Sequence, residues 1–204
     1  MKFSPKPTDA VKVEADLFIL FSHEDGSIPS FSQIQMNNLL KEMSQKENYE
    51  GKTGQVLSVT TKGLISSYKL VVVGLGKKEE IDLYSYQKAV AKAVSFAESI
   101  KAVKIAFLLD DEISKKFNIS ESIESTIEAV ILSSYKFLKY KGDEEKRQTR
   151  NIEEAFICLS AGKIGNFEEA VKSAQLKAQA TCYARDLVNE PAAVTTPSFL
   201  AEKA

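Results

Sequence analysis

The sequence predicts an α/β fold in which helices cover both faces of a mixed, mostly parallel sheet. Short runs around 17–21 and 70–73 are apolar throughout, as expected of strands that are covered on both faces. Longer segments, such as 82–100, instead repeat apolar residues at helical spacing. Strands that alternate with helices form parallel or mixed sheets, and a chain of 204 residues with 44% hydrophobic content can bury a core.

The first half of the chain is expected to alternate between the two kinds of element. In chain order, we predict a strand at 16–22, a helix at 32–46, strands at 55–61 and 68–73, and a helix at 82–100. The helix at 32–46 is indicated by helical spacing of Met36, Leu39, Leu40 and Met43. The next helix has a predicted buried face of Leu83, Tyr86, Val90, Val94 and Ala97. A turn signal at Lys62 and Gly63 indicates that the strands on either side form a hairpin.

The second half continues the same alternation. We predict a strand at 103–109, a helix that begins at Asn118, a charged loop at 141–150, a strand at 155–159 and a long helix capped at Asn166. The helix after Asn118 is expected to extend to Leu138, because apolar residues keep their helical spacing that far. The last helix has a face of small residues that predicts close packing against the sheet, namely Ala170, Ala174, Ala178 and Thr181.

A distinctive stretch at 184–201 ends one helix and starts another. Pro191 stops the first helix, while Thr196 is a suitable cap and Pro197 a suitable first residue for the next. We expect the chain to be ordered through Val188 and to loosen after Pro191, because a helix of so few residues is marginal alone. The signal predicts that the chain is cut from a longer protein and that another domain begins here.

The same stretch resembles the connector of the leucyl aminopeptidase family (cytosol aminopeptidases, peptidase family M17). The residues in step with that connector are Arg185, Asp186, Leu187, Asn189, Pro191, Thr196, Pro197, Leu200 and Ala201. Ala193 departs from the pattern, which usually has Asn there. The strand that runs into Gly74-Leu75-Gly76 and the Tyr135-Lys136-Phe137 triplet also resemble features of the family's macro-like N-terminal domain.

The resemblance implies a domain organisation and a function. Residues 1–188 would form the macro-like N-terminal domain, and residues 189–204 the connector and start of an absent C-terminal catalytic domain. The parent would release N-terminal amino acids, of the leucine type, from peptides with two divalent metal ions, Mn or Zn, held in that absent domain. The parent is expected to be a homohexamer, and this chain alone an inactive monomer or weak dimer.

The residues themselves assign no catalytic, cofactor-binding or metal site in this chain. The family's metal-binding string, N-T-D-A-E-G-R, is absent, and His23 is the only histidine, expected to be exposed in the loop at 23–26. Asp110, Asp111 and Glu112 are interpreted as a solvated turn or helix start rather than as a metal site.

One alternative function remains open. Because the family's N-terminal domain shares the macro architecture, a free-standing module could bind an ADP-ribose-like nucleotide through Gly74-Leu75-Gly76. The loop lacks the third small residue of a dinucleotide fingerprint, since Glu79 occupies that position.

Composition excludes several broad classes. A net charge of −1 argues against a general nucleic-acid-binding protein, and the longest early apolar run is too short to cross a membrane. Cys158 and Cys182 are expected to be buried, reduced thiols. We therefore expect a cytoplasmic protein that recognises neither membranes nor nucleic acids.

Overall fold

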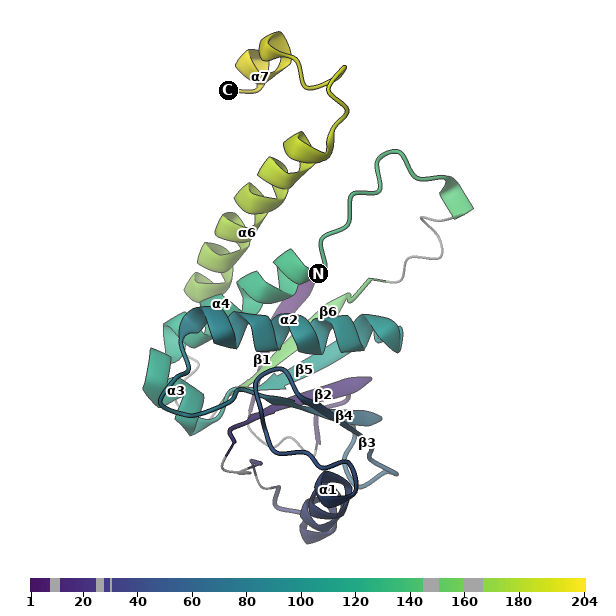
Figure 1. Cartoon of the computed structure of the whole chain (residues 1–204), viewed down its shortest axis with the longest axis vertical. Helices are drawn as coiled ribbons and strands as arrows, with labels where there is room; N and C mark the ends of the chain where they lie inside the picture. Colours follow the sequence, from purple (N-terminus) through teal and green to yellow (C-terminus); the bar gives the residue numbers. More distant parts are fainter. Residues whose placement is uncertain (8–11, 25–27, 30, 145–150, 160–166) are drawn as a thin grey trace.

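The computed structural model describes residues 1–7, 12–24, 28–29, 31–144, 151–159 and 167–204. In these ranges six strands form one sheet, in the order β1-β6-β5-β2-β4-β3 (Figure 1). Their bounds are β1 Lys2–Pro7, β2 Leu17–Ser22, β3 Val56–Thr60, β4 Lys69–Gly74, β5 Lys104–Leu108 and β6 Glu154–Leu159. All neighbouring strands are parallel except the β3–β4 pair, which is the predicted antiparallel hairpin.

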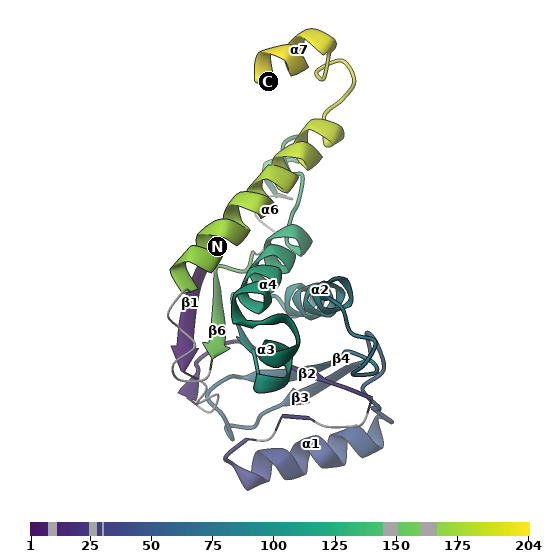
Figure 2. The ribbon, with the colours of Figure 1, turned by 90° about the vertical axis from the view of Figure 1, so that its left-hand side faces the viewer.

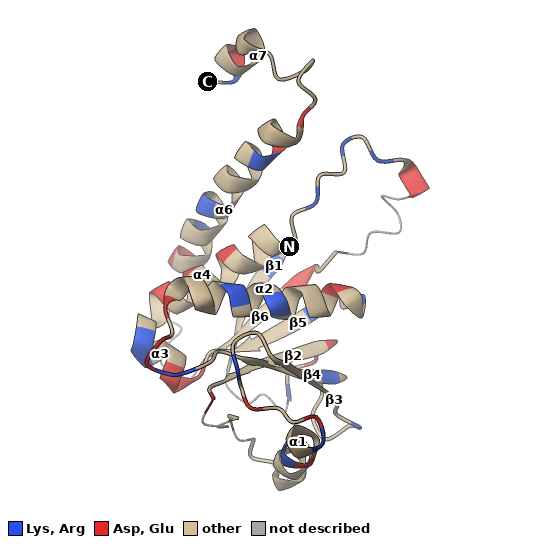
Figure 3. Cartoon of the chain, viewed as in Figure 1, with Lys and Arg blue, Asp and Glu red and all other residues tan. Residues whose placement is uncertain are grey.

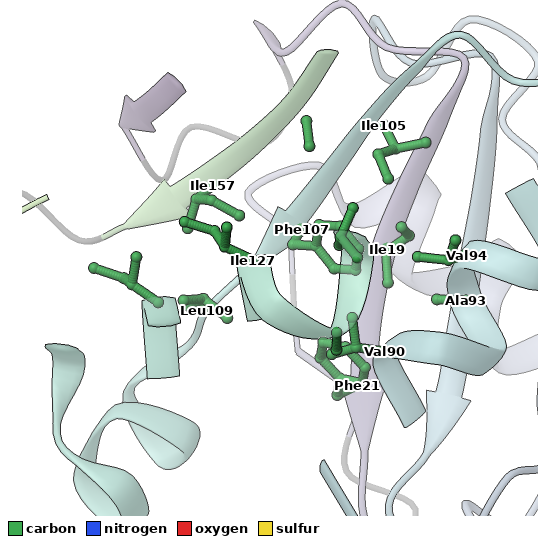
Figure 4. Close-up of a cluster of buried hydrophobic side chains, with 14 of the residues drawn as sticks. Ile19, Phe21, Val90, Ala93, Val94, Ile105, Phe107, Leu109, Ile127 and Ile157 are labelled. Carbon is green, nitrogen blue, oxygen red and sulfur yellow. The ribbon is translucent and has the colours of Figure 1, made fainter. Parts of the chain in front are cut away.

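Helices cover both faces of this sheet, as the sequence predicts (Figure 2). Helices α2 (Leu83–Ser99) and α4 (Ile119–Ser133) lie over one face, and α1 (Ile34–Lys46) lies over the other. Successive residues of β2 point to opposite faces: Ile19 joins the cluster under α2, while Leu20 joins the cluster under α1. Figure 4 shows the first cluster, with Ile19 close to Val94 of α2.

Strand β1 was not predicted from the sequence. It contains Pro5 and Pro7, which remove two backbone donors, and it pairs in parallel with β6 alone. The position explains why prolines are tolerated, since an edge strand leaves one row of backbone groups unpaired in any case. The prediction failed because two prolines in a short segment normally argue against a strand.

Two details of the β5–α4 region differ from the prediction. Residues Asp111–Phe117 form a separate helix, α3, and α4 ends at Ser133 rather than at Leu138. The amide of Ser134 donates to the carbonyl of Val130 at 3.1 Å, and Arg185 donates to the carbonyl of Leu132 at 2.7 Å. These bonds satisfy carbonyls at the end of the helix, and the residues that follow leave it.

The long helix α6 (Phe167–Asn189) packs mainly against α4 rather than directly against the sheet. Ala170, Ala174 and Ala178 are buried as predicted, but Thr181 is exposed because α6 has by then passed beyond the body (Figures 1 and 2). Asn166, the predicted cap, and most of the charged loop at 141–150 lie outside the described residues. A last short helix, α7 (Pro197–Lys203), stands apart from the sheet.

The described surface carries both signs of charge. Figure 3 shows basic and acidic residues interspersed along α2 and α6. No helix in the described ranges is long and apolar enough to cross a membrane. Cys158 is buried, whereas Cys182 is only partly buried, and neither takes part in a disulfide.

Candidate functional site

The loop after β4 is closed by the protein's own backbone. The amide of Gly74 donates to the carbonyl of Gln55 at 2.8 Å, and that of Leu75 donates to Ser22 at 2.8 Å. The amide of Gly76 donates to the carbonyl of Gly51 at 3.0 Å. A phosphate cradle needs free amide groups that point at the ligand, and these three amides are all engaged.

Close packing of the 51–55 segment explains why glycines occur in this loop. A Cβ atom at Gly74 would lie 2.1 Å from the carbonyl oxygen of Lys52. At Gly76 it would lie 2.2 Å from the hydroxyl of Thr53, and the backbone there has φ of 81°. The geometry therefore supports a packing role for these glycines and gives no support to nucleotide binding through this loop.

The acidic cluster after β5 is a helix start, one of the two interpretations that the sequence left open. The carboxylate of Asp110 caps α3 by accepting the amide of Ile113 at 3.0 Å. Glu112 pairs with Lys78 at 2.5 Å. Within the described ranges, no group of three His, Cys, Asp or Glu side chains could hold a metal ion. The described residues therefore offer no site for the divalent ions that the resemblance implies for the parent.

The expectation that His23 is exposed is wrong, since only 6% of its surface is accessible. Its backbone lies against Gly51, where an added Cβ would come within 2.1 Å of the His23 carbonyl oxygen. The ring nitrogen Nε2 is 3.9 Å from the nearer oxygen of Glu112. The one sequence signal for burial is that His23 directly follows the fully buried strand β2.

A second group of polar residues joins the end of α4 to the C-terminal part of α6. We call Tyr135, Arg185, Asp186 and Asn189 the connector anchor. The hydroxyl of Tyr135 donates to Asp186 at 2.7 Å and accepts from the side-chain amide of Asn189 at 3.1 Å. The guanidinium of Arg185 lies 5.5 Å from the centre of the Tyr135 ring. Desolvation, together with the bond to Asp186, raises the pKa of Tyr135.

Glu190, the last residue before Pro191, is held by a separate pair of contacts. Its carboxylate accepts from Lys139 at 2.5 Å and from the hydroxyl of Tyr140 at 2.5 Å. These contacts tie the segment after α4 to the point where α6 ends. The end of α6 therefore has a defined direction relative to the body.

After α6 the chain forms a short turn and then a capped helix, as the sequence predicts. The carbonyl of Pro191 accepts the amides of Val194 at 2.8 Å and Thr195 at 3.1 Å, which closes a turn without any side chain at Ala193. Thr196 caps α7 by accepting the amide of Phe199 at 3.2 Å, and Pro197 is its first residue. None of the residues of α7 is buried.

Comparison with known families assigns this architecture. The sequence profile described as "Cytosol aminopeptidase family, N-terminal domain" matches residues 20–144, which is more than half of the chain. The chain belongs to the cytosol aminopeptidase family. The resemblance inferred from the connector is thereby confirmed by a part of the sequence that does not contain the connector.

Relatives in the cytosol aminopeptidase family align beyond the matched region. A probable cytosol aminopeptidase of Clostridium perfringens is 28% identical over 201 residues, which covers 98% of this chain and 40% of that protein. The corresponding protein of Aquifex aeolicus is 33% identical over 169 residues, covering 82% of this chain and 32% of its own length. The chain thus spans less than half of the length of the curated relatives it matches.

Solved structures agree with the fold of a cytosol aminopeptidase N-terminal domain. A tomato leucine aminopeptidase mutant superposes with a TM-score of 0.81 at 23% identity, over 100% of this chain and 41% of that one. A bottromycin maturation enzyme in complex with Mn gives a TM-score of 0.66 at 20% identity, over 93% of this chain and 35% of that one. At these identities the likeness concerns the fold, and it confirms the predicted α/β architecture.

Proposed function

We propose that this chain is the non-catalytic N-terminal domain of a cytosolic leucyl aminopeptidase. The complete protein would release N-terminal amino acids, leucine among them, from peptide substrates. Two divalent ions, Mn or Zn, would be bound by its C-terminal domain, where such ions activate water and polarise the scissile carbonyl. The observation that carries the proposal is the family match over residues 20–144.

The role proposed for this chain is to orient the domain that follows it. The connector anchor fixes the C-terminal part of α6 against the end of α4, and Glu190 is held by two further side chains. A domain attached after α7 would therefore be attached to a helix whose direction is set by the body. Residues 189–204 are the proposed connector and start of that domain.

The structure gives the alternative, a free-standing nucleotide-binding module, no supporting observation. In the loop proposed to bind the nucleotide, the amides of Gly74 and Gly76 bond to the 51–55 segment and that of Leu75 bonds to Ser22. A free-standing module also has no evident use for a capped helix such as α7, which none of the described residues buries.

Hydrolysis of leucine p-nitroanilide tests the proposal. The complete gene product and the 204-residue chain are assayed side by side after metal removal and after addition of Mn²⁺ or Zn²⁺. We expect metal-dependent hydrolysis by the complete product and none above buffer by the chain alone. Metal-dependent turnover by the purified chain, or a complete product inactive with either ion, would refute it.

A further inference from the structure

Helix α6 carries two apolar faces, of which one is buried. The buried face lies in its first part and consists of Phe167, Ala170, Val171, Ala174 and Ala178. The second face follows with the spacing i, i+3, i+4, i+7, i+8, which is typical of a helix that packs against protein. We call it the outer face of α6, and it consists of Ala180, Tyr183, Ala184, Leu187 and Val188. None of these five residues is buried.

The outer face lies on the part of α6 that projects beyond the body (Figures 1 and 2). Val188 is 83% exposed and Tyr183 is 49% exposed. The only charged side chains between Ala180 and Val188 are those of Arg185 and Asp186, and both contact the end of α4 and the residues after it. The outer face therefore has no charged residue of its own, whereas a helix face that stays in water is normally polar.

The connector places the start of any following domain close to this face. Only residues 190–196 separate α6 from α7. The hydroxyl of Thr195 donates to the carbonyl of Leu187 at 3.2 Å, so the connector turns back to the last turns of α6. Helix α7 has no buried residue, and its Leu200 is exposed. A domain that begins with α7 therefore begins one short connector away from the outer face.

The size of the outer face favours a partner on the same polypeptide. Nine helical residues form a surface on the order of 14 Å long and 10 Å wide. Stable interfaces between separate proteins bury roughly 800 Å² on each partner, which is more than this face alone can supply. A domain joined by a short connector needs less contact area, because the connector gives it an effective concentration in about the millimolar range.

We propose that the outer face of α6 packs against the domain that follows α7 in the same polypeptide. The proposal rests on the proposed function, in which such a domain exists, and it adds where that domain docks. The relatives extend well beyond the aligned part, since this chain covers 40% of the Clostridium perfringens protein and 32% of the Aquifex aeolicus protein. The docking surface on the following domain is apolar, because an unpaired charge buried against Tyr183 or Val188 would be costly.

Photocross-linking of the complete gene product tests this placement. Tyr183 is replaced by p-benzoylphenylalanine, which keeps an aromatic side chain and bonds to neighbouring C–H groups on irradiation. We expect a cross-linked species with the mass of one chain on a denaturing gel, in which the joined peptide lies beyond Ala204. Tyr84→p-benzoylphenylalanine, at another exposed tyrosine in the first turn of α2, is the control and should give at least about tenfold less of that species.

The other occupants of the outer face would give different products. A species with the mass of two chains would assign the face to a second copy, and a bond within residues 1–204 would assign it to this domain itself. Either result, no cross-link from Tyr183, or an equal yield from Tyr84 would overturn the proposal. Hydrolysis of leucine p-nitroanilide by the same preparation separates this proposal from the proposed function. An active product without the cross-link refutes the docking alone, whereas an inactive product with the cross-link refutes only the peptidase activity.

A charge placed on the outer face gives a second test. Val188→Lys should leave amide exchange across 180–189 unchanged or slightly slower in the 204-residue chain, because a cation near the end of a helix is favourable. In the complete gene product it should accelerate that exchange at least about tenfold, because it puts a charge into an apolar contact. Ile34→Lys makes the same kind of change at an exposed residue of α1 and should alter neither. Hydrogen exchange read by mass spectrometry measures both proteins, and equal exchange in the wild-type and Val188→Lys complete products would contradict the docking.

Discussion

Because Gly74 has no side chain, the 51–55 segment can pack directly against the end of β4. The 51–55 segment crosses the end of β4 so closely that its carbonyl groups occupy the space of a Cβ atom. In return, the amides of Gly74 and Gly76 are paired with that segment. The glycines that resemble a phosphate loop in sequence are therefore explained by packing.

Replacing Gly74 by alanine should destabilise the chain. The added methyl group would overlap the Lys52 carbonyl and force the 51–55 segment to move, at a cost of about 1–3 kcal/mol. The midpoint of urea unfolding, followed by circular dichroism, measures the change. Gly142→Ala is the matched control, because a Cβ atom there meets nothing within 4 Å, and it should leave the midpoint unchanged or slightly higher. Equal midpoints for wild type and Gly74→Ala would contradict the packing explanation.

Single residues show the limit of sequence reasoning most clearly. The Gly74-Leu75-Gly76 triplet is compatible with a phosphate loop or with backbone packing, and only the position of the 51–55 segment distinguishes them. His23 was predicted to be exposed because it lies in a loop beside Glu24 and Asp25, yet it is buried, and its backbone lies against Gly51, a residue distant in sequence. The pocket at the carboxyl ends of β2, β4 and β5, which is lined by Phe21, His23, Leu75 and Asp110, could not be predicted, since it depends on which face of the sheet each connection follows.

The two ends of helix α6 are held by different kinds of contact. Its first part is buried against α4 through alanines, whereas its last part is held by the polar contacts of the connector anchor. Isolated helical segments are marginal in water, so the exposed part depends on such tertiary contacts. We therefore expect the connector anchor to set the free energy of local unfolding at the C-terminal end of α6.

Tyr135→Phe removes the hydroxyl that bonds to both Asp186 and Asn189. We expect amide exchange across 182–189 to accelerate about threefold to tenfold, as follows from losing roughly 1 kcal/mol of local stability. Hydrogen exchange read by mass spectrometry measures it, with β4 as the internal reference. Tyr183→Phe, an exposed tyrosine on the same helix, is the control and should not change the exchange rate. Similar exchange in both variants would show that the connector anchor does not hold α6.

The elements were predictable where local signals and tertiary packing agree. The strands β2, β4, β5 and β6 each contain a continuous apolar run, and α1 and α2 carry regular apolar faces, so the hydrophobic pattern identifies them. Strand β1 was missed because its pairing with β6 overrides the prolines. Helix α4 was predicted too long because the contacts of Leu132 and Tyr135 with Arg185 and Asp186 of α6 are not visible in the α4 sequence.

At the scale of the whole molecule, helices lie over both faces of the sheet, whereas no residue of α7 is buried. The curated relatives are more than twice as long as this chain, which covers 40% of the Clostridium perfringens protein and 32% of the Aquifex aeolicus protein. We propose that the complete protein is a homohexamer and that most of its interface lies in the C-terminal domain.

The chain alone is accordingly expected to be a monomer or at most a weak dimer. Static light scattering at low micromolar concentration should give a mass close to the 22.6 kDa of one chain. The complete gene product, measured under the same conditions, should give a mass about six times its own chain mass. A stable hexamer of the 204-residue chain would show that this domain itself builds the interface.

The most direct test of the central claim is to read the coding sequence downstream of Ala204. If this chain is the N-terminal domain of a leucyl aminopeptidase, the reading frame should continue for a further catalytic domain. That continuation should contain a carboxylate-rich metal-binding string such as N-T-D-A-E-G-R. A stop codon directly after Ala204, or a continuation without clustered metal ligands, would contradict the account.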